Sequence, residues 1–334
     1  MSAPLARRRP AWLGHLLPGL LFVAAATLLG SQVAALDRPG FVLEMARPWA
    51  EIGVVAVAMT AVMLTGGIDL SVGAVIALTG MVLGQLWQRG GLPIGAACAA
   101  AVLVAALAGL GNGILITAGI APLVATLATM ALYAGLAIAL ASGERVTGLP
   151  ESLTIWGQGT WQGIPCQFWL LLIALAAGWL LVHHTRWGRY LFALGDNPLA
   201  ARYAAVPVRR IECALYTLSG AVAGLVGLFY TARGGAAIAD AGRGLELAAI
   251  ACVVVGGTRV TGGVGGIAKT ALGIAIVALL DIGLELSNVR PLVLPWSGQP
   301  WQIGATGRLI MLGVLVIAVA IWNERWSAAS RDDS

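Results

Sequence analysis

Charged residues and cysteines are both scarce in this chain, and each shortage limits what it can be. Only 10% of its 334 residues are charged, whereas 59% are hydrophobic. So little polar surface cannot cover a water-soluble globule of this size. Four cysteines stand singly, without the paired spacing of a metal site or a redox pair. The composition therefore predicts an all-α integral membrane protein with no metal site and no cofactor.

The basic residues are scattered between apolar runs rather than gathered on one surface. The net charge of +5 therefore does not indicate a nucleic-acid partner. If both termini are cytoplasmic, most of the Lys and Arg residues fall on the cytoplasmic side, as the positive-inside rule favours. This distribution predicts an even number of spans with both termini in the cytoplasm.

A spanning helix needs about 20 apolar residues, which leaves room for about ten spans. The segments expected to cross are 11–30, 50–65, 71–88, 94–118, 121–142, 166–184, 209–232, 245–257, 267–286 and 303–323. The spans 50–65 and 245–257 are too short alone. Each begins near an acid and runs into a pair of glycines, Gly66-Gly67 and Gly256-Gly257 respectively.

These two glycine pairs indicate an internal duplication. Glycine-interrupted segments in corresponding halves are typical of a solute path, because broken backbone inside a membrane is tolerated only where protein or water meets it. Close helix packing is the alternative use of such glycines. We interpret Gly66, Gly67, Gly256 and Gly257 as part of a translocation path.

Polar side chains follow the first glycine pair. Asp69 is an acid at the membrane edge with no basic neighbour in sequence, and an ionisable residue in such a place is a functional candidate. Ser71 can cap the helix 71–88. We interpret Asp69 mainly as a structural acceptor for N–H groups at the start of that helix, and contact with solute is the alternative. Asp69 and Ser71 join the predicted path.

A polar segment, 185–210, divides the chain into two apolar halves. The first half covers 1–184 and the second 211–323, before a polar tail at 324–334. We expect all of 1–334 to form one transmembrane domain with this segment in the cytoplasm.

Within that segment a short helix is predicted. Asn197 can cap it, and Pro198 suits its first position, where a missing N–H costs nothing. Leu199 and Tyr203 then share one face, with Arg202 beside them. A short, capped helix of this shape suits insertion into a groove on another protein, although an ordinary solvated loop is the alternative.

Several motifs resemble one family. They are GDNPLAAR at 195–202, VPVRR at 206–210, YTLSG at 216–220, GGIDLSVG at 66–73, and Asn112-Gly113 followed by IAPLVATL at 120–127. Together they resemble the permeases of bacterial sugar ATP-binding cassette (ABC) importers, of the ribose, xylose, galactose, rhamnose and autoinducer-2 type. The departures from the family pattern, at Ala248 and 281–285, leave the solute open.

The resemblance implies a permease of the bacterial inner membrane, which is not itself an enzyme. Its implied partners are an ABC ATPase subunit, a second permease subunit that is identical or paralogous, a periplasmic solute-binding protein and the lipid bilayer. It adds Asn112 to the translocation path. The residues implied to couple the permease to the ATPase are Gly195, Asp196, Asn197, Pro198, Leu199, Arg202 and Tyr203.

Two other classes of protein also fit parts of the sequence. A secondary carrier driven by an ion gradient would use Asp69 or Asp281 as its proton site and need no ATPase. A membrane scaffold without transport activity fits the composition but leaves the two glycine pairs unexplained. Nucleotide binding by the near-miss phosphate loop at 263–270 is rejected, because no strand, turn and helix surround it.

Overall fold

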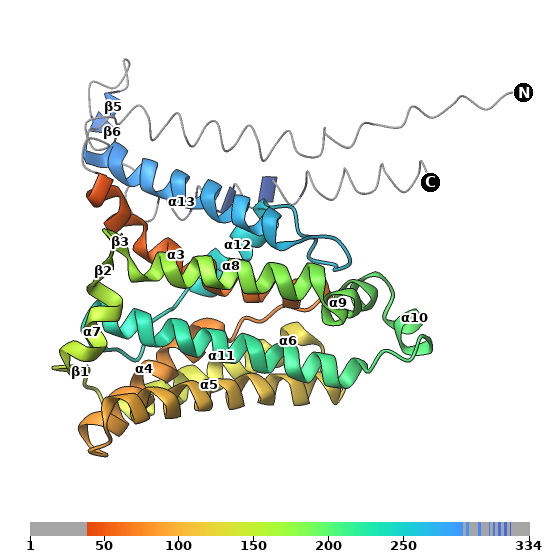
Figure 1. The fold of residues 1–334 in the computed structure, drawn as a ribbon, viewed down its shortest axis with the longest axis horizontal. Coiled ribbons are helices and arrows are strands. Elements are labelled where there is room, and N and C mark those ends of the chain that lie inside the picture. The colour runs from red at the N-terminus through yellow and green to blue at the C-terminus, as the bar shows by residue number, and fades with distance from the viewer. Residues whose placement is uncertain are drawn as a thin grey trace, which may run out of the picture.

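The computed structural model describes residues 39–289, short pieces at 292–293 and 300–301, and scattered helical positions between 307 and 321. The predicted span 11–30, the tail 324–334 and most of the predicted span 303–323 lie outside the described residues. The described part is a bundle of helices whose axes run mostly along one direction (Figure 1).

Helices make up most of the described chain. They are α3 (Pro39–Leu64), α4 (Val72–Gln88), α5 (Ile94–Thr117), α6 (Pro122–Ala141), α7 (Glu151–Gln158), α8 (Cys166–His184), α9 (Arg186–Asp196), α10 (Pro198–Tyr203), α11 (Val208–Gly234), α12 (Leu245–Val255) and α13 (Ile267–Val289). Three antiparallel pairs of two-residue strands connect them: β1 (Val146–Thr147) with β4 (Ala236–Ala237), β2 (Thr160–Trp161) with β3 (Ile164–Pro165), and β5 (Leu292–Val293) with β6 (Pro300–Trp301).

Six of the described helices are long and apolar enough to cross a membrane: α3, α5, α6, α8, α11 and α13. Two further apolar helices are shorter, α4 with 17 residues and α12 with 11. The chain is therefore a mostly helical, multi-pass membrane protein. The predicted bounds of the helices within 94–142 and 166–184 agree with α5, α6 and α8 to within a residue.

The helix α3 corrects the prediction for 50–65. It has 26 residues, so it is not a short span. Its third turn carries the charged residue Arg47. Arg47 is only 4% exposed, and its guanidinium donates to backbone carbonyls of residues 157–159, to Gln167 Oε1 and to Glu44 Oε1. Because these acceptors satisfy the two terminal nitrogens of the guanidinium, the helix continues through Arg47.

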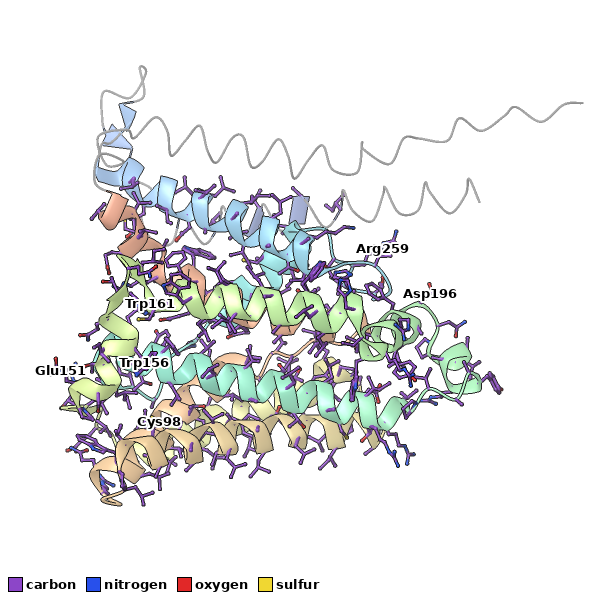
Figure 2. All side chains as sticks on the ribbon, viewed as in Figure 1. Cys98, Glu151, Trp156, Trp161, Asp196 and Arg259 are labelled. Carbon is purple, nitrogen blue, oxygen red and sulfur yellow. The ribbon has the colours of Figure 1, made fainter. Side chains whose placement is uncertain are left out.

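The two ends of the bundle are chemically different. Glu151, Trp156 and Trp161 lie at one end, which we name the α7 end, and Asp196 and Arg259 lie at the other, which we name the α10 end (Figure 2). Helices α3 and α8 run from the α7 end to the α10 end, and α11 and α13 run back (Figure 1).

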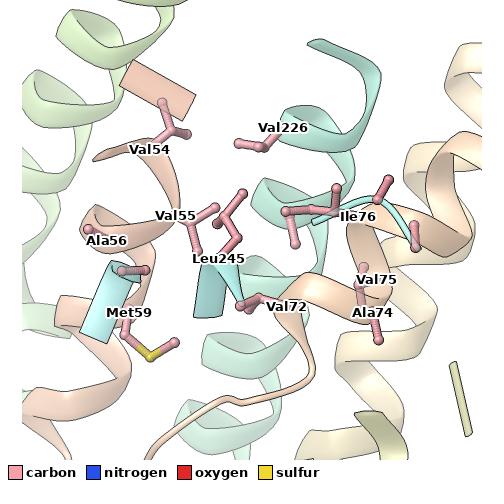
Figure 3. Close-up of a cluster of buried hydrophobic side chains, with 14 of the residues drawn as sticks. Val54, Val55, Ala56, Met59, Val72, Ala74, Val75, Ile76, Val226 and Leu245 are labelled. Atoms are coloured by element: carbon pink, nitrogen blue, oxygen red, sulfur yellow. The ribbon is translucent and has the colours of Figure 1, made fainter. Parts of the chain in front are cut away.

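The two short helices begin next to each other inside the bundle. Val72 at the start of α4 lies beside Leu245 at the start of α12, and both lie near Val55 in α3 (Figure 3). Gly73 is packed so closely that an added Cβ would lie 2.6 Å from the carbonyl oxygen of Gly242. From this meeting point α4 runs to the α7 end and α12 to the α10 end (Figure 1). The predicted short span 245–257 therefore corresponds to α12, with 11 residues, whereas 50–65 belongs to the longer α3, and the helix that meets α12 is the 17-residue α4.

Candidate functional site

The helix α10 projects at the α10 end, with the cap that the sequence predicts. Asn197 Oδ1 accepts hydrogen bonds from the N–H groups of Leu199 and Ala200, both at 3.0 Å, and Pro198 opens the helix. Two large side chains on this helix are exposed, Leu199 at 60% and Tyr203 at 84%. The protruding helix therefore carries an apolar surface that nothing in the described chain covers.

The helix α9 was not predicted. Thr185 caps it by accepting from the N–H of Gly188, and Leu191 and Leu194 are buried. Its arginines lie on the opposite, exposed side. In the sequence these charges hide the buried face of the helix within the polar segment 185–210. The signal that identifies it is the threonine cap followed by apolar residues at helical spacing.

At the end of α9 four glycines bring three segments into backbone contact, and we name this place the glycine junction (Gly66, Gly195, Gly262 and Gly263). The N–H of Gly263 donates to the carbonyl of Leu64 at 3.0 Å. An added Cβ on Gly195 would lie within 3.0 Å of both of those groups, and one on Gly262 would lie 2.7 Å from Gly66 N. The coupling segment thus rests directly on the end of α3 and on the loop after α12.

Asp69 lies in a buried polar cluster (Asp69, Ser71, Asn112 and Ser219). Its Oδ1 accepts from the N–H and hydroxyl of Ser71, at 3.0 and 2.7 Å, and its Oδ2 accepts from the hydroxyl of Ser219 at 2.7 Å. Asn112 Nδ2 donates to Ser71 Oγ at 2.8 Å. These contacts join the start of α4 to α5 and α11.

The cluster corrects one local prediction and adds two residues. Ser71 makes no side-chain cap to α4, because its hydroxyl donates to Asp69, and Asp69 takes the N–H of Ser71 instead. Tyr216 lies alongside, with its hydroxyl 2.5 Å from where a Cβ on Gly67 would stand. Sequence reasoning missed Ser219 and Tyr216 as site residues, although both belong to the YTLSG motif.

Both glycine pairs follow the end of a helix, but they do not correspond residue for residue. Gly66 has φ +80 and Gly257 has φ +96, and in each case the next residue donates back five positions, to Val62 and Val253. This is a left-handed helix ending that favours glycine. Gly66 therefore matches Gly257, the second glycine of its pair. Internal duplication of the breaks stays a prediction.

Three residues after each matched glycine stand Asp69 in the first break and Val260 in the second. The second break therefore has no counterpart of that carboxylate. The other glycine of the second pair, Gly256, packs against the backbone of Lys269. The predicted path residues therefore fall into separate places. Asp69, Ser71 and Asn112 share one buried cluster, Gly66 lies at the glycine junction, and Gly256 lies against α13.

A second buried polar cluster at the α7 end was also missed. Glu51 is 1% exposed and receives two hydrogen bonds from the Arg233 guanidinium, at 2.8 and 2.9 Å. With Arg47 it fixes α3 to α11 and to the chain around α7. Among the described residues no group of three or more His, Cys, Asp or Glu side chains is placed to hold a metal ion.

A transport permease typically has several membrane-crossing helices and shorter helices that meet inside the bundle. This chain has both, and a capped helix projects at one end. The chain belongs to the family described as branched-chain amino acid transport system / permease component, whose model matches residues 41–319.

Relatives with curated names are transport permeases as well. The chain is 40% identical over 212 residues to the ribose import permease protein RbsC of Escherichia coli (strain K12), covering 61% of this chain and 65% of that protein. It is 38% identical over 216 residues to the autoinducer 2 import system permease protein LsrD of Yersinia enterocolitica, covering 63% of this chain and 65% of that protein. The match thus spans 65% of the length of these relatives. No solved structure matches.

Proposed function

We propose that this chain is the membrane-spanning permease subunit of an ABC importer in the bacterial inner membrane. Its cargo is a sugar or sugar-like solute delivered by a periplasmic binding protein, and a separate subunit hydrolyses ATP. The import of ribose and of autoinducer 2 by the named relatives supports a polar, hydroxyl-rich cargo.

The observation that carries the proposal is the exposed helix α10 together with the glycine junction behind it. Leu199 and Tyr203 offer a small apolar surface, with the exposed Arg202 beside them, and a groove on the ATPase subunit would cover it. When ATP closes the ATPase subunits, α10 is displaced. Because Gly195 contacts the backbone at the end of α3, that displacement passes to both glycine breaks.

The direction of the helices supports the proposed orientation. Helix α3 begins and α13 ends at the α7 end (Figure 1). If the predicted spans 11–30 and 303–323 each cross once, the chain has ten crossings and both termini lie on the same side as α10, the cytoplasm. The α7 end then faces the periplasm, where the binding protein docks.

A second permease subunit, identical or paralogous, completes the importer in this proposal. The whole chain acts as one transmembrane domain whose two halves rock against those of the partner. In that cycle Gly66, Gly67, Gly256 and Gly257 allow the backbone breaks to move. The cluster around Asp69, Ser71 and Asn112 holds the start of α4 in place along the path.

Replacing both Leu199 and Tyr203 with Asp tests the proposal. Burying unpaired carboxylates costs several kcal/mol, which is comparable to the whole contact. We expect the ATPase subunit to co-purify poorly and its activity to stop responding to loaded binding protein. The control variant, Leu199→Met with Tyr203→Phe, keeps the apolar surface and should behave like the wild type. Uptake that survives the Asp substitutions and persists after ATP depletion would overturn the ABC permease assignment.

A further inference from the structure

Two charged residues lie where the helices α4 and α12 meet, and the predicted path did not include them. Arg243 is exposed and Glu246 is half-buried, and they flank the start of α12. The described residues supply one hydrogen bond to Glu246, from the N–H of Gly244 to Oε1 at 3.1 Å. They supply no hydrogen bond or ion pair to Arg243. Both groups therefore keep hydrogen-bonding capacity unused.

Helix lengths place these residues deep in the membrane. Gly73, at the start of α4, touches Glu246, since an added Cβ there would lie within 3.0 Å of Glu246 Oε2. At 1.5 Å per residue, α4 extends about 24 Å from that point to the α7 end, and α12 extends about 15 Å towards the α10 end. Together the two helices extend about 39 Å, which is more than the roughly 30 Å hydrocarbon core, so their outer ends pass beyond the core. The backbone that carries Arg243 and Glu246, at their meeting point, therefore lies inside it.

An exposed cation and a half-buried carboxylate at this depth are costly against lipid. Intramembrane charges almost always face a bundle interior or a water-filled cavity. The N-terminal ends of α4 and α12 both lie at Glu246. A further acceptor lies at the same end of α4, where Asn112 Oδ1 is buried without a partner among the described residues.

We propose that Glu246 and Arg243 form a solute-binding subsite at mid-depth in the translocation path, and that the subsite recognises a neutral, polyhydroxylated solute. This inference rests on the proposed transport function. The carboxylate accepts hydrogen bonds from solute hydroxyls, and the guanidinium donates to hydroxyl or ring oxygens. Because the two charges are opposite, the subsite is close to neutral and suits an uncharged cargo.

The first test measures whether water reaches the subsite. Leu247, the next residue along α12, is 63% exposed, and Leu107, midway along α5, is 55% exposed. In a full chain with its four native cysteines replaced by alanine, a single cysteine is placed at either position. The membrane-impermeant thiol reagent MTSET should label Leu247→Cys and leave Leu107→Cys unlabelled, because a thiolate forms only in water. Equal labelling at both positions, or none at Leu247→Cys, would overturn the subsite.

The second test addresses the class of solute. Labelling of Leu247→Cys should slow in a mixture of D-ribose, D-xylose and D-galactose and stay unchanged in L-leucine. The variant Glu246→Gln should weaken that protection by roughly tenfold to a hundredfold, the usual effect of losing a charged hydrogen bond. Failure of the sugars to protect, or protection by L-leucine alone, refutes a polyhydroxylated solute.

These readouts separate the subsite from the coupling proposal. Labelling depends on neither the ATPase subunit nor α10, and Glu246→Gln should leave co-purification of the ATPase subunit unchanged. An importer that fails the α10 test can therefore still show a wet, sugar-protected Leu247→Cys.

Discussion

Replacing Gly195 with alanine is the most direct test of the glycine junction. A Cβ at this position would stand 1.9 Å from the carbonyl oxygen of Leu64, whereas ordinary contacts of this kind lie at 3.4–4 Å. The obstacle is backbone, so no flexible side chain can move aside. Relief requires a shift of about 1.5 Å that moves α9 away from Leu64 O and from Gly263 N–H, the two groups that hydrogen-bond to each other beneath it.

The expected cost follows from this overlap. Forcing an extra carbon into a packed site costs typically about 1–3 kcal/mol. That cost falls on the contact between the coupling segment and the breaks, while the exposed face of α10 is unchanged. We therefore expect Gly195→Ala to keep its ATPase subunit and to hydrolyse ATP, but to lose at least tenfold in solute uptake.

The assay measures uptake and ATP hydrolysis on the same proteoliposomes, and thermal stability of the purified protein in detergent. Gly135→Ala in α6 is the matched control, since a Cβ there meets nothing within 4 Å. It should match or slightly exceed the wild type in stability, as alanine favours a helix over glycine. Wild-type uptake and stability in Gly195→Ala would refute the close contact and the transmission through it.

Two further predictions concern orientation and the first break. Cysteines placed at Ser2 and Ser334 should be protected from impermeant reagents in intact cells, whereas one at Gly159 should be labelled from outside; labelling of either terminus from outside would contradict an even number of spans. Gly67→Val should abolish uptake while the protein still inserts, because a Cβ there would lie 2.5 Å from the Tyr216 hydroxyl. Loss of assembly would indicate a packing role, and normal uptake at normal expression would exclude this site from the mechanism.

The sequence was sufficient for several features that depend on neighbouring residues. The cap at Asn197 and the start of α10 at Pro198 follow from local hydrogen bonding and a fixed φ, so both were predictable. The bounds of α5, α6 and α8 follow from uninterrupted apolar runs between polar or proline residues.

Predictions failed where partners are distant in sequence. Arg47 can lie inside α3 because all of its acceptors except Glu44 are 110 to 120 residues away in sequence, and no local rule identifies them. Asp69 and Ser219 are 150 residues apart. The meeting of α4 and α12 inside the bundle was missed for a similar reason, since hydropathy does not reveal that Gly73 and Gly242 are in contact.

The short length of α12 has a consequence for how the protein is made. Its 11 residues extend about 16 Å, roughly half of what a helix needs to partition into a membrane by itself. When the ribosome releases residues 235–266, the α3, α4 and α11 segments have already been synthesised. The short helix can then dock against Gly73 rather than face lipid with unpaired backbone groups. Insertion of the second half therefore depends on an assembled first half, and the chain must mature in the order in which it is translated.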